Sequence, residues 1–242
     1  MKNDRTLVII PAYNEAEYIG AVITGLRALY PLTDILVVDD NSTDATAAVA
    51  RGMNCVVLRH AVNLGDGASR QTGYLYAWKC GYEYAVHMDA DGQHLPRYIN
   101  DLLEPLKQNT ADITIGSRFL KDTGYSNTFL KHIGVRFFNR IASFFTGVRI
   151  TDSTSGFRAV NRKVMHFYCC QGFYPSRYPD ADLIIVSHRA GYRIMEVAVE
   201  MLPNRKLKPL HHGMSIIYYV FKMLLSILVT VLREKPKGGQ KP

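Results

Sequence analysis

Residues 85–96, AVHMDADGQHLP, lead an apolar run into two aspartates one residue apart, followed by a glycine and a glutamine. The apolar run predicts a buried strand, and side chains two residues apart on an extended backbone point the same way. Asp89, Asp91 and Gln93 would then present three oxygens in one direction at the end of that strand. Mg²⁺ and Mn²⁺ prefer hard oxygen ligands, so we expect these residues to bind one such ion. The alternative is an aspartate-rich turn that closes the strand.

Segments on either side of this stretch alternate between strands and helices. Apolar runs predict strands at residues 6–10, 34–40, 54–58, 82–88 and 112–117. Amphipathic or helical patterns predict helices at residues 16–29, from near Thr43 onward, at 66–80 and at 127–145. Ser42 is the expected N-cap of the second helix. Such alternation predicts an α/β fold, with a mostly parallel central sheet flanked by helices.

Polar clusters follow three of the expected strands, with the sequences PAYNE (11–15), DDNSTD (39–44) and DADGQ (89–93). Ligands of parallel sheets bind beyond the carboxyl ends of the strands, so we expect one site there. The glycine pattern of dinucleotide-binding folds is missing, because GDGASR (65–70) has Arg70 where the third glycine belongs. The Walker A pattern is missing too. Both observations argue against NAD and P-loop chemistry.

Composition limits the remaining function classes. The chain has 242 residues with 48% hydrophobic content, enough for a substantial core, and its net charge is +8. Basic charge suits nucleic acid, anionic membranes or phosphorylated substrates. The chain has no zinc-finger spacing or RNA-binding aromatic motif, so we expect no nucleic-acid partner. The four cysteines lack metal or disulfide spacing, and the N-terminus does not resemble a signal peptide, which favours a cytosolic setting.

Six motifs in order resemble the family 2 glycosyltransferases, in particular their polyprenyl-phosphate sugar synthase branch. They are VIIPAYNE (8–15), VVDDNSTDAT (37–46), NLGDGASRQTG (63–73), MDADGQH (88–94), IGSRF (115–119) and DSTSGFRA (152–159). The resemblance spans residues 6–202. It implies a GT-A type nucleotide-diphospho-sugar transferase fold. It also implies inverting, metal-dependent transfer of a hexose from a UDP- or GDP-sugar to a polyprenyl phosphate, such as undecaprenyl or dolichyl phosphate.

Donor binding is assigned by the same resemblance. The residues implied in nucleotide binding are Pro11, Tyr13, Glu15, Asp39, Asp40 and Asp89. Asp89, Asp91 and Gln93 would hold Mg²⁺ or Mn²⁺ against the diphosphate, and Asp91 would thereby act in catalysis. Asp66 departs from the pattern, because the synthases more often have a basic residue there, and this would alter nucleotide or sugar choice. Leu95 also replaces a frequent acidic residue.

The acceptor decides which other residues act. A phosphate monoester has its second pKa near about 6, so it is already ionised and needs cations rather than a base. Arg118 would grip phosphate as a catalytic residue, and Arg136 and Arg158 would receive the lipid phosphate; a surface position is the alternative for Arg118 and Arg136. A sugar hydroxyl instead needs a base. Asp180 and Asp182 stand where sugar-to-sugar members have their catalytic carboxylate, and Asp182 could equally cap a helix or face solvent.

Residues 214–232, MSIIYYVFKMLLSILVTVL, are long enough to cross a bilayer. Their polar residues, Ser215, Lys222, Ser226 and Thr230, share one helical stripe, and a central lysine costs about 2.5–3.5 kcal/mol in a spanning helix. An amphipathic helix lying on an anionic membrane, or pairing with a second copy, is therefore favoured over a span. Docking onto the chain's own core remains open.

The expected organisation is a catalytic domain at 1–203, a basic linker at 204–213, the amphipathic helix at 214–233 and a basic tail at 234–242. From residue 204 onward eight lysines and arginines stand against one glutamate. We expect a peripheral protein on the cytoplasmic face of the membrane, possibly a homo-oligomer, with a separate small membrane protein handling product. The competing hypothesis from another class is a non-catalytic nucleotide-sugar binding scaffold.

Overall fold

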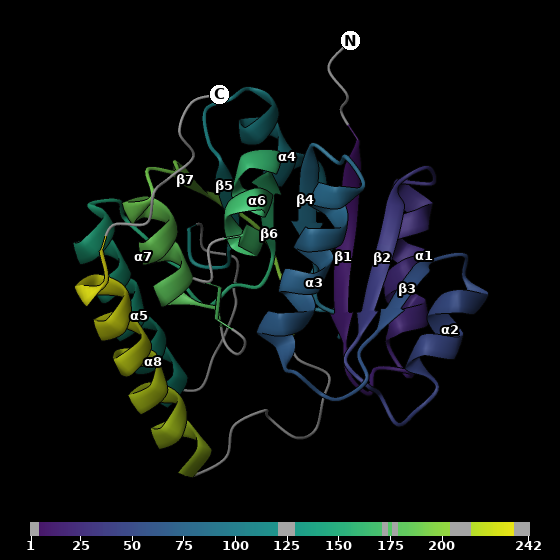
Figure 1. Cartoon of the computed structure of the whole chain (residues 1–242), viewed down its shortest axis with the longest axis horizontal. Helices are drawn as coiled ribbons and strands as arrows, with labels where there is room; N and C mark the ends of the chain where they lie inside the picture. Colours follow the sequence, from purple (N-terminus) through teal and green to yellow (C-terminus); the bar gives the residue numbers. More distant parts are fainter. Residues whose placement is uncertain (1–4, 121–128, 171–173, 176–178, 204–213, 235–242) are drawn as a thin grey trace.

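A 7-stranded sheet forms the centre of the molecule, with strand order β3-β2-β1-β4-β6-β5-β7 (Figure 1). This computed structural model describes residues 5–120, 129–170, 174–175, 179–203 and 214–234. The strands are β1 (Thr6–Ala12), β2 (Asp34–Asp39), β3 (Val56–Arg59), β4 (Tyr84–His87), β5 (Ile113–Ser117), β6 (Arg158–Asn161) and β7 (Ile194–Ala198). The five strands predicted from apolar runs are confirmed.

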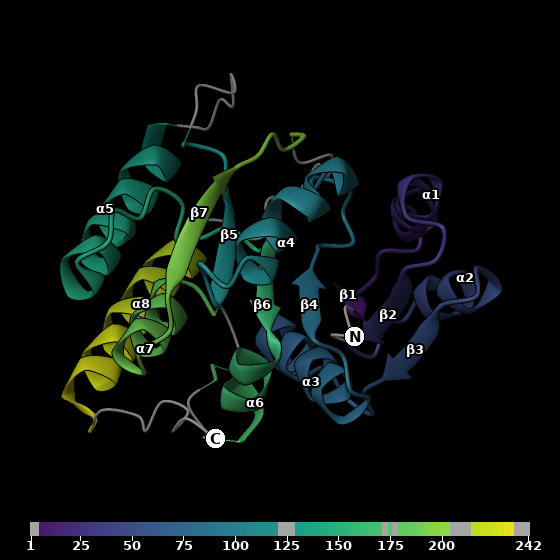
Figure 2. The same ribbon diagram turned by 90° about the horizontal axis from the view of Figure 1, so that it is seen from above.

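Helices cover both faces of the sheet. They are α1 (Ile19–Leu29), α2 (Thr46–Gly52), α3 (Asp66–Lys79), α4 (Ile99–Lys107), which follows the 3-10 helix η1 (Pro96–Tyr98), α5 (Phe129–Thr146), α6 (Arg162–Cys170), α7 (Ala181–Arg189) and α8 (Met214–Leu232). Figure 2 shows α3 and α6 on one side of the sheet and α1 and α4 on the other. Two apolar cores result, one on each face. The α/β fold predicted from the sequence is therefore confirmed.

One strand runs against the others. β1 pairs in parallel with β2 and β4, and β5 pairs in parallel with β7, whereas β6 is antiparallel to β4 and β5. Arg158, the first residue of β6, therefore lies opposite His87, the last residue of β4. The segment that enters β6 thus meets the carboxyl ends of the parallel strands, where the polar clusters were expected.

The predicted start of the second helix is wrong. α2 begins at Thr46 rather than near Thr43, and its N-cap position makes no side-chain hydrogen bond. Ser42 instead accepts a hydrogen bond from the amide of Asn14, at 2.9 Å. Asp44 accepts from the amide of Thr46, at 2.9 Å, and so takes over the role expected of the serine. The first helix is also shorter than predicted at its start.

α8 packs against α7 through Met223 and Ile227, which are 2% and 5% exposed. Ser226 faces inward with them and bonds to Asp182 in α7. The polar stripe therefore does not all face outward, and docking onto the chain's own core is what the structure shows. Among the side chains of α8 that the structure describes, the exposed large apolar ones are Phe221, Leu224, Leu225, Leu228, Val229 and Leu232. Among the described residues, no helix has the length and hydropathy needed to cross a membrane.

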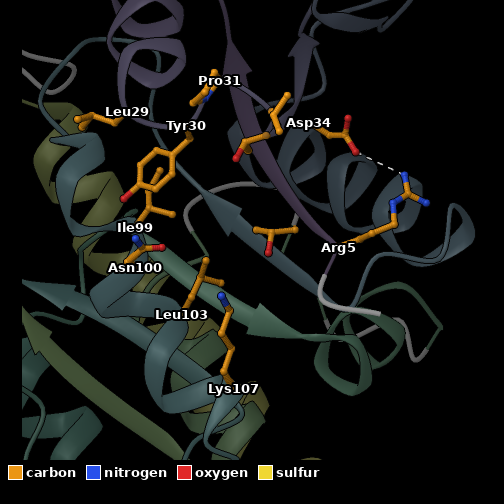
Figure 3. A pocket seen from close by; sticks show the side chains of 12 residues that line it. Arg5, Leu29, Tyr30, Pro31, Asp34, Ile99, Asn100, Leu103 and Lys107 are labelled. Carbon is orange, nitrogen blue, oxygen red and sulfur yellow. Dashed lines mark hydrogen bonds and ion pairs between the residues drawn. The ribbon is translucent and has the colours of Figure 1, made fainter. Parts of the chain in front are cut away.

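A hollow of about 450 Å³ lies where β1 and β2 begin, and Figure 3 shows side chains from α1, the loop after it and α4 around it. Arg5 and Asp34 form an ion pair at its rim, at 3.4 Å. None of the residues predicted for the site lines this hollow. The chemistry expected from the sequence therefore belongs to the opposite edge of the sheet.

Candidate active site

Asp89 lies just beyond the end of β4, in a turn rather than on an extended strand. The strand ends at His87, the two residues after Asp89 form a turn, and Gly92 has a φ of +78°. Asp91 accepts a hydrogen bond from the amide of Gln93, at 3.0 Å, which stabilises this turn. The premise that alternation along an extended backbone aligns the three side chains is therefore wrong. Their joint binding of a cation stays a prediction.

Three nitrogen-bearing side chains surround the carboxylate of Asp89. His87 Nε2 lies 3.4 Å from Oδ1, His94 Nε2 lies 3.6 Å from Oδ2, and Arg70 reaches Oδ1 at 3.9 Å. Burial opposes ionisation of Asp89, but His94 and His87, when protonated at acid pH, and the guanidinium of Arg70 outweigh it and lower its pKa to about 2. The carboxylate is therefore ionised throughout the physiological range.

The two imidazoles beside Asp89 carry their hydrogens on different nitrogens. His87 Nδ1 donates to the carbonyl of Gly156, so Nε2 of the neutral ring has a lone pair. His94 Nδ1 accepts from the amide of Asp89, at 3.0 Å, so its hydrogen is on Nε2. Burial lowers the pKa of both histidines and favours the neutral rings. His94 is also stacked on Phe157, with ring centroids 4.9 Å apart.

The first turn of α3 supplies the other side of this cluster. Arg70 Nε donates to Asp66 Oδ1 at 3.1 Å, and its terminal nitrogen lies 2.7 Å from Oδ2. One donor atom from each of Asp66, His87 and Asp89 lies within 4.8 Å of the other two. Sequence reasoning noted Asp66 only as a departure and did not select His87. The available signal for His87 was a histidine inside an apolar strand.

The residues predicted to hold the nucleotide lie at the ends of β1 and β2. Tyr13 is 47% exposed, whereas Pro11 and Glu15 are buried, and the amide of Glu15 donates to Thr46 Oγ1 at 2.8 Å. Tyr13 is thus the one of the three that presents most of its side chain to a ligand. The structure brings all three to the same edge as Asp89, as the sequence predicted.

Asp39 and Asp40, the acidic pair after β2, are both buried. Arg59 Nε lies 3.2 Å from Asp39 Oδ2 and covers it from the solvent side. Asp40 accepts from the amides of Leu64 and Gly65, at 2.9 and 2.8 Å, and so fixes the loop before α3. Asp40 therefore shapes the site through that loop, whereas the contact of Asp39 with a nucleobase stays a prediction.

Arg118 follows β5 and grips a carboxylate of the chain itself. Its Nε and terminal nitrogen donate to the two oxygens of Asp152, both at 2.7 Å, and its amide donates to Oδ2 at 3.1 Å. A further bond to Thr154 Oγ1, at 3.1 Å, holds the segment leading to β6. Such a bidentate pair is strong, so a phosphate would have to compete with Asp152 for Arg118.

The two arginines predicted for the lipid phosphate differ in exposure. Arg158 is 4% exposed and donates to the carbonyls of Ser153, Ser155 and Pro179, at 2.8, 2.8 and 3.1 Å. Arg136 is exposed on α5. The structure therefore gives Arg158 a clear part in holding the loops beside β6, whereas Arg136 presents its guanidinium to solvent. Their contact with an acceptor stays a prediction.

Asp182, the predicted base, lies in the first turn of α7 and is 2% exposed. Its Oδ1 accepts from the amide of Leu183 at 2.8 Å, and Oδ2 accepts from the hydroxyl of Ser226. Burial raises its pKa, and the Ser226 hydrogen bond opposes that shift. Both oxygens are thus engaged inside the protein, on the side where α8 docks.

The mostly parallel sheet, covered by helices on both faces, has a fold of the GT-A type, as its similarity to solved structures shows. Residues 7–168 match the glycosyl transferase family 2, and the chain belongs to this family. It is a glycosyltransferase, and both the fold and the family predicted from its motifs are confirmed.

The chain is similar to enzymes named for polyprenyl phosphates. It is 35% identical over 168 residues to the polyprenol monophosphomannose synthase of Mycolicibacterium smegmatis, covering 66% of this chain and 63% of that one. It is 31% identical over 202 residues to the undecaprenyl-phosphate mannosyltransferase of Micrococcus luteus, covering 81% and 82%. Among solved structures, glucosyl-3-phosphoglycerate synthase from Mycobacterium tuberculosis, in complex with Mn²⁺, UDP-glucose and phosphoglyceric acid, superimposes with a TM-score of 0.72. That match has 18% identity and covers 94% of this chain and 80% of the other.

Proposed function

We propose that this chain transfers a hexose from a UDP- or GDP-sugar to a polyprenyl phosphate, with inversion and with a divalent cation. The observation that carries the proposal is the Asp89 carboxylate, held ionised at the carboxyl edge of the sheet. The names of the two mannosyl-transferring relatives support the acceptor. The Mn²⁺ and UDP-glucose of the structural neighbour support the donor class.

The residues present suit a cation. Asp89 offers a carboxylate of low pKa, and Asp91 and Gln93 follow it in the same turn. These three residues are the proposed ligands of Mg²⁺ or Mn²⁺. When bound, the ion would act as a Lewis acid that offsets charge on the departing nucleoside diphosphate. Asp91 would contribute to catalysis through this contact.

Chemistry at the acceptor needs no base of the chain's own. An ionised phosphate oxygen would attack C1 of the sugar from the face opposite the diphosphate, forming the new C–O bond. The bond from C1 to the donor's diphosphate oxygen breaks, and its electron pair leaves with the nucleoside diphosphate. Arg136, which is exposed on α5, would bind the incoming phosphate. Arg118 and Arg158 would hold the loops beside the acceptor, through their hydrogen bonds to Asp152 and to the carbonyl of Ser153.

A hydroxyl acceptor is the weaker alternative, because it requires Asp182 as a base. That carboxylate is 2% exposed, and both of its oxygens accept hydrogen bonds from within the protein. Asp182→Asn keeps an oxygen for Ser226 while removing the base. We expect this variant to retain most of its transfer rate to polyprenyl phosphate; a fall of about 10²-fold or more would support the hydroxyl mechanism.

The acceptor implies a place at a membrane. The proposed location is peripheral, on the cytoplasmic face, with the exposed apolar residues of α8 and its basic flanks against anionic lipid. Pairing of two copies through α8, and a separate small membrane protein as partner, belong to the same proposal.

The test incubates purified full-length chain with Mn²⁺, polyprenyl phosphate and each of a panel of radiolabelled UDP- and GDP-sugars. We expect label from one donor to enter the organic phase, and expect it to vanish with a chelator or in Asp89→Asn. Anomeric analysis of the product reports inversion. No organic-phase label from any donor, or transfer that survives chelation, would overturn the proposal as stated.

A further inference from the structure

We infer that His87 and Asp66, together with Asp89, form a divalent-cation site with one nitrogen ligand, and that this nitrogen makes the site prefer Mn²⁺ to Mg²⁺. The inference deepens the proposed function, on which its catalytic meaning rests. It adds two ligands to Asp89, and neither of them belongs to the proposed triad of Asp89, Asp91 and Gln93. The nitrogen and oxygen donors of the three residues lie within 4.8 Å of one another.

His87 Nε2 is the central observation. The residue is 1% exposed, and Nε2 has no hydrogen-bond partner among the described residues. Asp89 Oδ1 lies 3.4 Å from this nitrogen without forming a hydrogen bond to it. A cation bound by both atoms would give Nε2 the partner that it lacks among the described residues. A buried polar atom without a partner destabilises the protein, and a bound cation would remove that penalty.

Gly156 supplies the support that metal-binding histidines usually have. Its carbonyl accepts the hydrogen of His87 Nδ1, which fixes the ring orientation and leaves Nε2 as the ligand atom. His94, on the other side of Asp89, has the opposite arrangement, because its Nδ1 accepts from the amide of Asp89. Its Nε2 therefore carries the hydrogen and cannot ligate. Of the two imidazoles beside Asp89, only His87 is set up as a ligand.

Asp66 supplies the third donor and is itself oriented. Arg70 bonds to both of its oxygens, at 3.1 Å from Nε and 2.7 Å from the terminal nitrogen. Each carboxylate oxygen has a second lone pair, so Asp66 can bind an ion while Arg70 holds it. The Asp66 side chain is 42% exposed, which leaves an open side for water or a diphosphate oxygen.

The ligand set has a consequence for ion choice. Mg²⁺ favours oxygen ligands alone, whereas first-row transition ions accept imidazole nitrogen as well. A site with one imidazole and two carboxylates therefore gains more affinity for Mn²⁺ than for Mg²⁺. The preference for Mn²⁺ distinguishes this site from the all-oxygen site proposed above, whose ligands are Asp89, Asp91 and Gln93.

The experiment measures binding of Mn²⁺ alone to the full-length chain, without nucleotide and without a histidine tag. Free Mn²⁺ is followed by electron paramagnetic resonance, and bound Mn²⁺ by electron spin-echo modulation, which detects a directly bonded ¹⁴N. In the His87→Asn variant, the side-chain amide nitrogen is the same number of bonds from Cβ as Nδ1 is in histidine. The hydrogen bond to the Gly156 carbonyl can therefore persist, while the proposed ligand atom Nε2 is removed. We expect the ¹⁴N signal to disappear and the Kd for Mn²⁺ to rise about tenfold or more.

Two further variants keep the test decisive. Asp66→Asn, at the exposed end of the cluster, should also raise the Kd but retain the ¹⁴N signal, and it remains informative where the buried His87→Asn fails to fold. His166→Asn removes an exposed imidazole on α6 and should change neither quantity. In the wild-type protein, the Kd for Mg²⁺, measured by competition with Mn²⁺, should exceed the Kd for Mn²⁺. The ratio of these two Kd values should be smaller in His87→Asn.

Absence of ¹⁴N coupling in the wild type, or an unchanged Kd in both ligand variants, would overturn the inference. That failure is distinct from failure of the proposed function, which is read from sugar label in the organic phase. If the wild-type protein transfers label but its bound Mn²⁺ has no nitrogen ligand, the proposed function is supported and the His87 site is contradicted. If Mn²⁺ has a nitrogen ligand but no label is transferred, the His87 site is supported and the proposed function is contradicted.

Discussion

At the scale of single residues, Gly156 fixes how closely the segment before β6 approaches Asp89. A Cβ at this position would lie 3.0 and 3.1 Å from the two carboxylate oxygens of Asp89 and 3.2 Å from His87 Cε1. Such contacts are tighter than side chains normally make, so the carboxylate would have to move by a few tenths of an ångström. The absence of a side chain at Gly156 is therefore a requirement of the site, and its φ is not in the left-handed region.

Gly156→Ala should weaken the site more than the fold. Because displacing a catalytic group by about 1 Å can cost about 10²-fold in rate, we expect a smaller displacement here to lower kcat/KM by about tenfold. The measurement is transfer of sugar label at saturating Mn²⁺, with the thermal midpoint recorded in parallel. Gly52→Ala, where a Cβ meets nothing within 4 Å, is the matched control and should leave the rate unchanged. An unaffected rate in Gly156→Ala would show that the contact is not limiting.

The position of Asp89 was predictable from sequence because it follows a strand directly, and a strand end fixes a residue at the sheet edge. The surroundings of Asp89 were not. The carbonyl that orients His87 belongs to Gly156, which is 69 residues away. The extended-backbone argument failed at Asp91 because Asp91 itself caps a turn by accepting the amide of Gln93. Local periodicity carries no information about either contact.

At the scale of helices and strands, the least expected contact joins α7 to α8. Asp182 accepts a hydrogen bond from Ser226, and Arg189 donates to the backbone carbonyls of Thr230 and Arg233 at the end of α8. The heptad-like spacing of polar residues in α8 suggested a stripe facing water. The structure shows that one polar member of a stripe can instead serve a buried carboxylate, a distinction that spacing alone does not make.

Ser226→Ala should loosen α8 without unfolding the catalytic domain. Removing the donor leaves the buried carboxylate of Asp182 with one fewer hydrogen bond, at a cost of about 1–3 kcal/mol. We expect amide hydrogen exchange to accelerate across α8 while exchange in β1 and β4 stays unchanged. Leu228→Ala, on the exposed side of the same helix, is the control and should leave exchange near that of wild type. Equal exchange in Ser226→Ala and wild type would contradict a stabilising role for this bond.

A second pair of elements is joined by Asp112, where β5 begins. Its Oδ2 accepts from the amide and Nε of Arg193, at 2.9 and 3.0 Å, just before β7, and Oδ1 accepts from Asn161 at 2.8 Å. Burial raises the pKa of Asp112, but these hydrogen bonds outweigh burial and lower it below 3.8. The ionised carboxylate therefore stabilises the fold above that pH, and this contribution is lost as pH falls through the lowered pKa.

Asp112→Asn should thus reduce the acid sensitivity of the protein. At neutral pH we expect it to lower the free energy of unfolding by about 1–3 kcal/mol, because charge-assisted bonds are lost. Between about pH 5 and pH 2 the difference from wild type should shrink, since the wild-type carboxylate becomes protonated. Urea unfolding across this range measures both effects. A difference that stays constant with pH would show that Arg193 does not hold the carboxylate ionised.

For the whole molecule, the sequence predicted the parallel part of the sheet but not its completion. β1 to β5 follow apolar runs separated by helices, which local patterns show well. β6 has four residues, RAVN, and its antiparallel direction depends on where the chain turns after α5. β7 completes the edge beside β5. The register that places Arg158 beside His87 follows from this topology, so the arrangement of the site could not be predicted before the fold was known.

The outward side of α8 exposes apolar side chains, and we expect this side of the whole molecule to face a membrane. Leu225, Leu228 and Leu232 are 50%, 53% and 75% exposed, with Arg233 exposed beside them. Burying such side chains in lipid gains about 1 kcal/mol each when half of each is already covered, and cations add attraction to anionic lipid. We therefore expect the full-length chain to float with anionic vesicles, and less so in high salt.

The double variant Leu228→Ser and Leu232→Ser should lower the vesicle-bound fraction at limiting lipid. Losing about 1 kcal/mol at each position, about 2 kcal/mol in all, corresponds to an apparent affinity loss of about thirtyfold. Leu32→Ser is the matched control: its side chain is 95% exposed, but it follows α1 at the edge of the sheet opposite Asp89. Flotation of both variants beside wild type separates a specific face from general surface hydrophobicity. An equal loss of vesicle binding in Leu32→Ser would indicate general surface hydrophobicity. Unchanged binding in the double variant would place the membrane contact elsewhere and leave α8 with its structural role beside Asp182 alone.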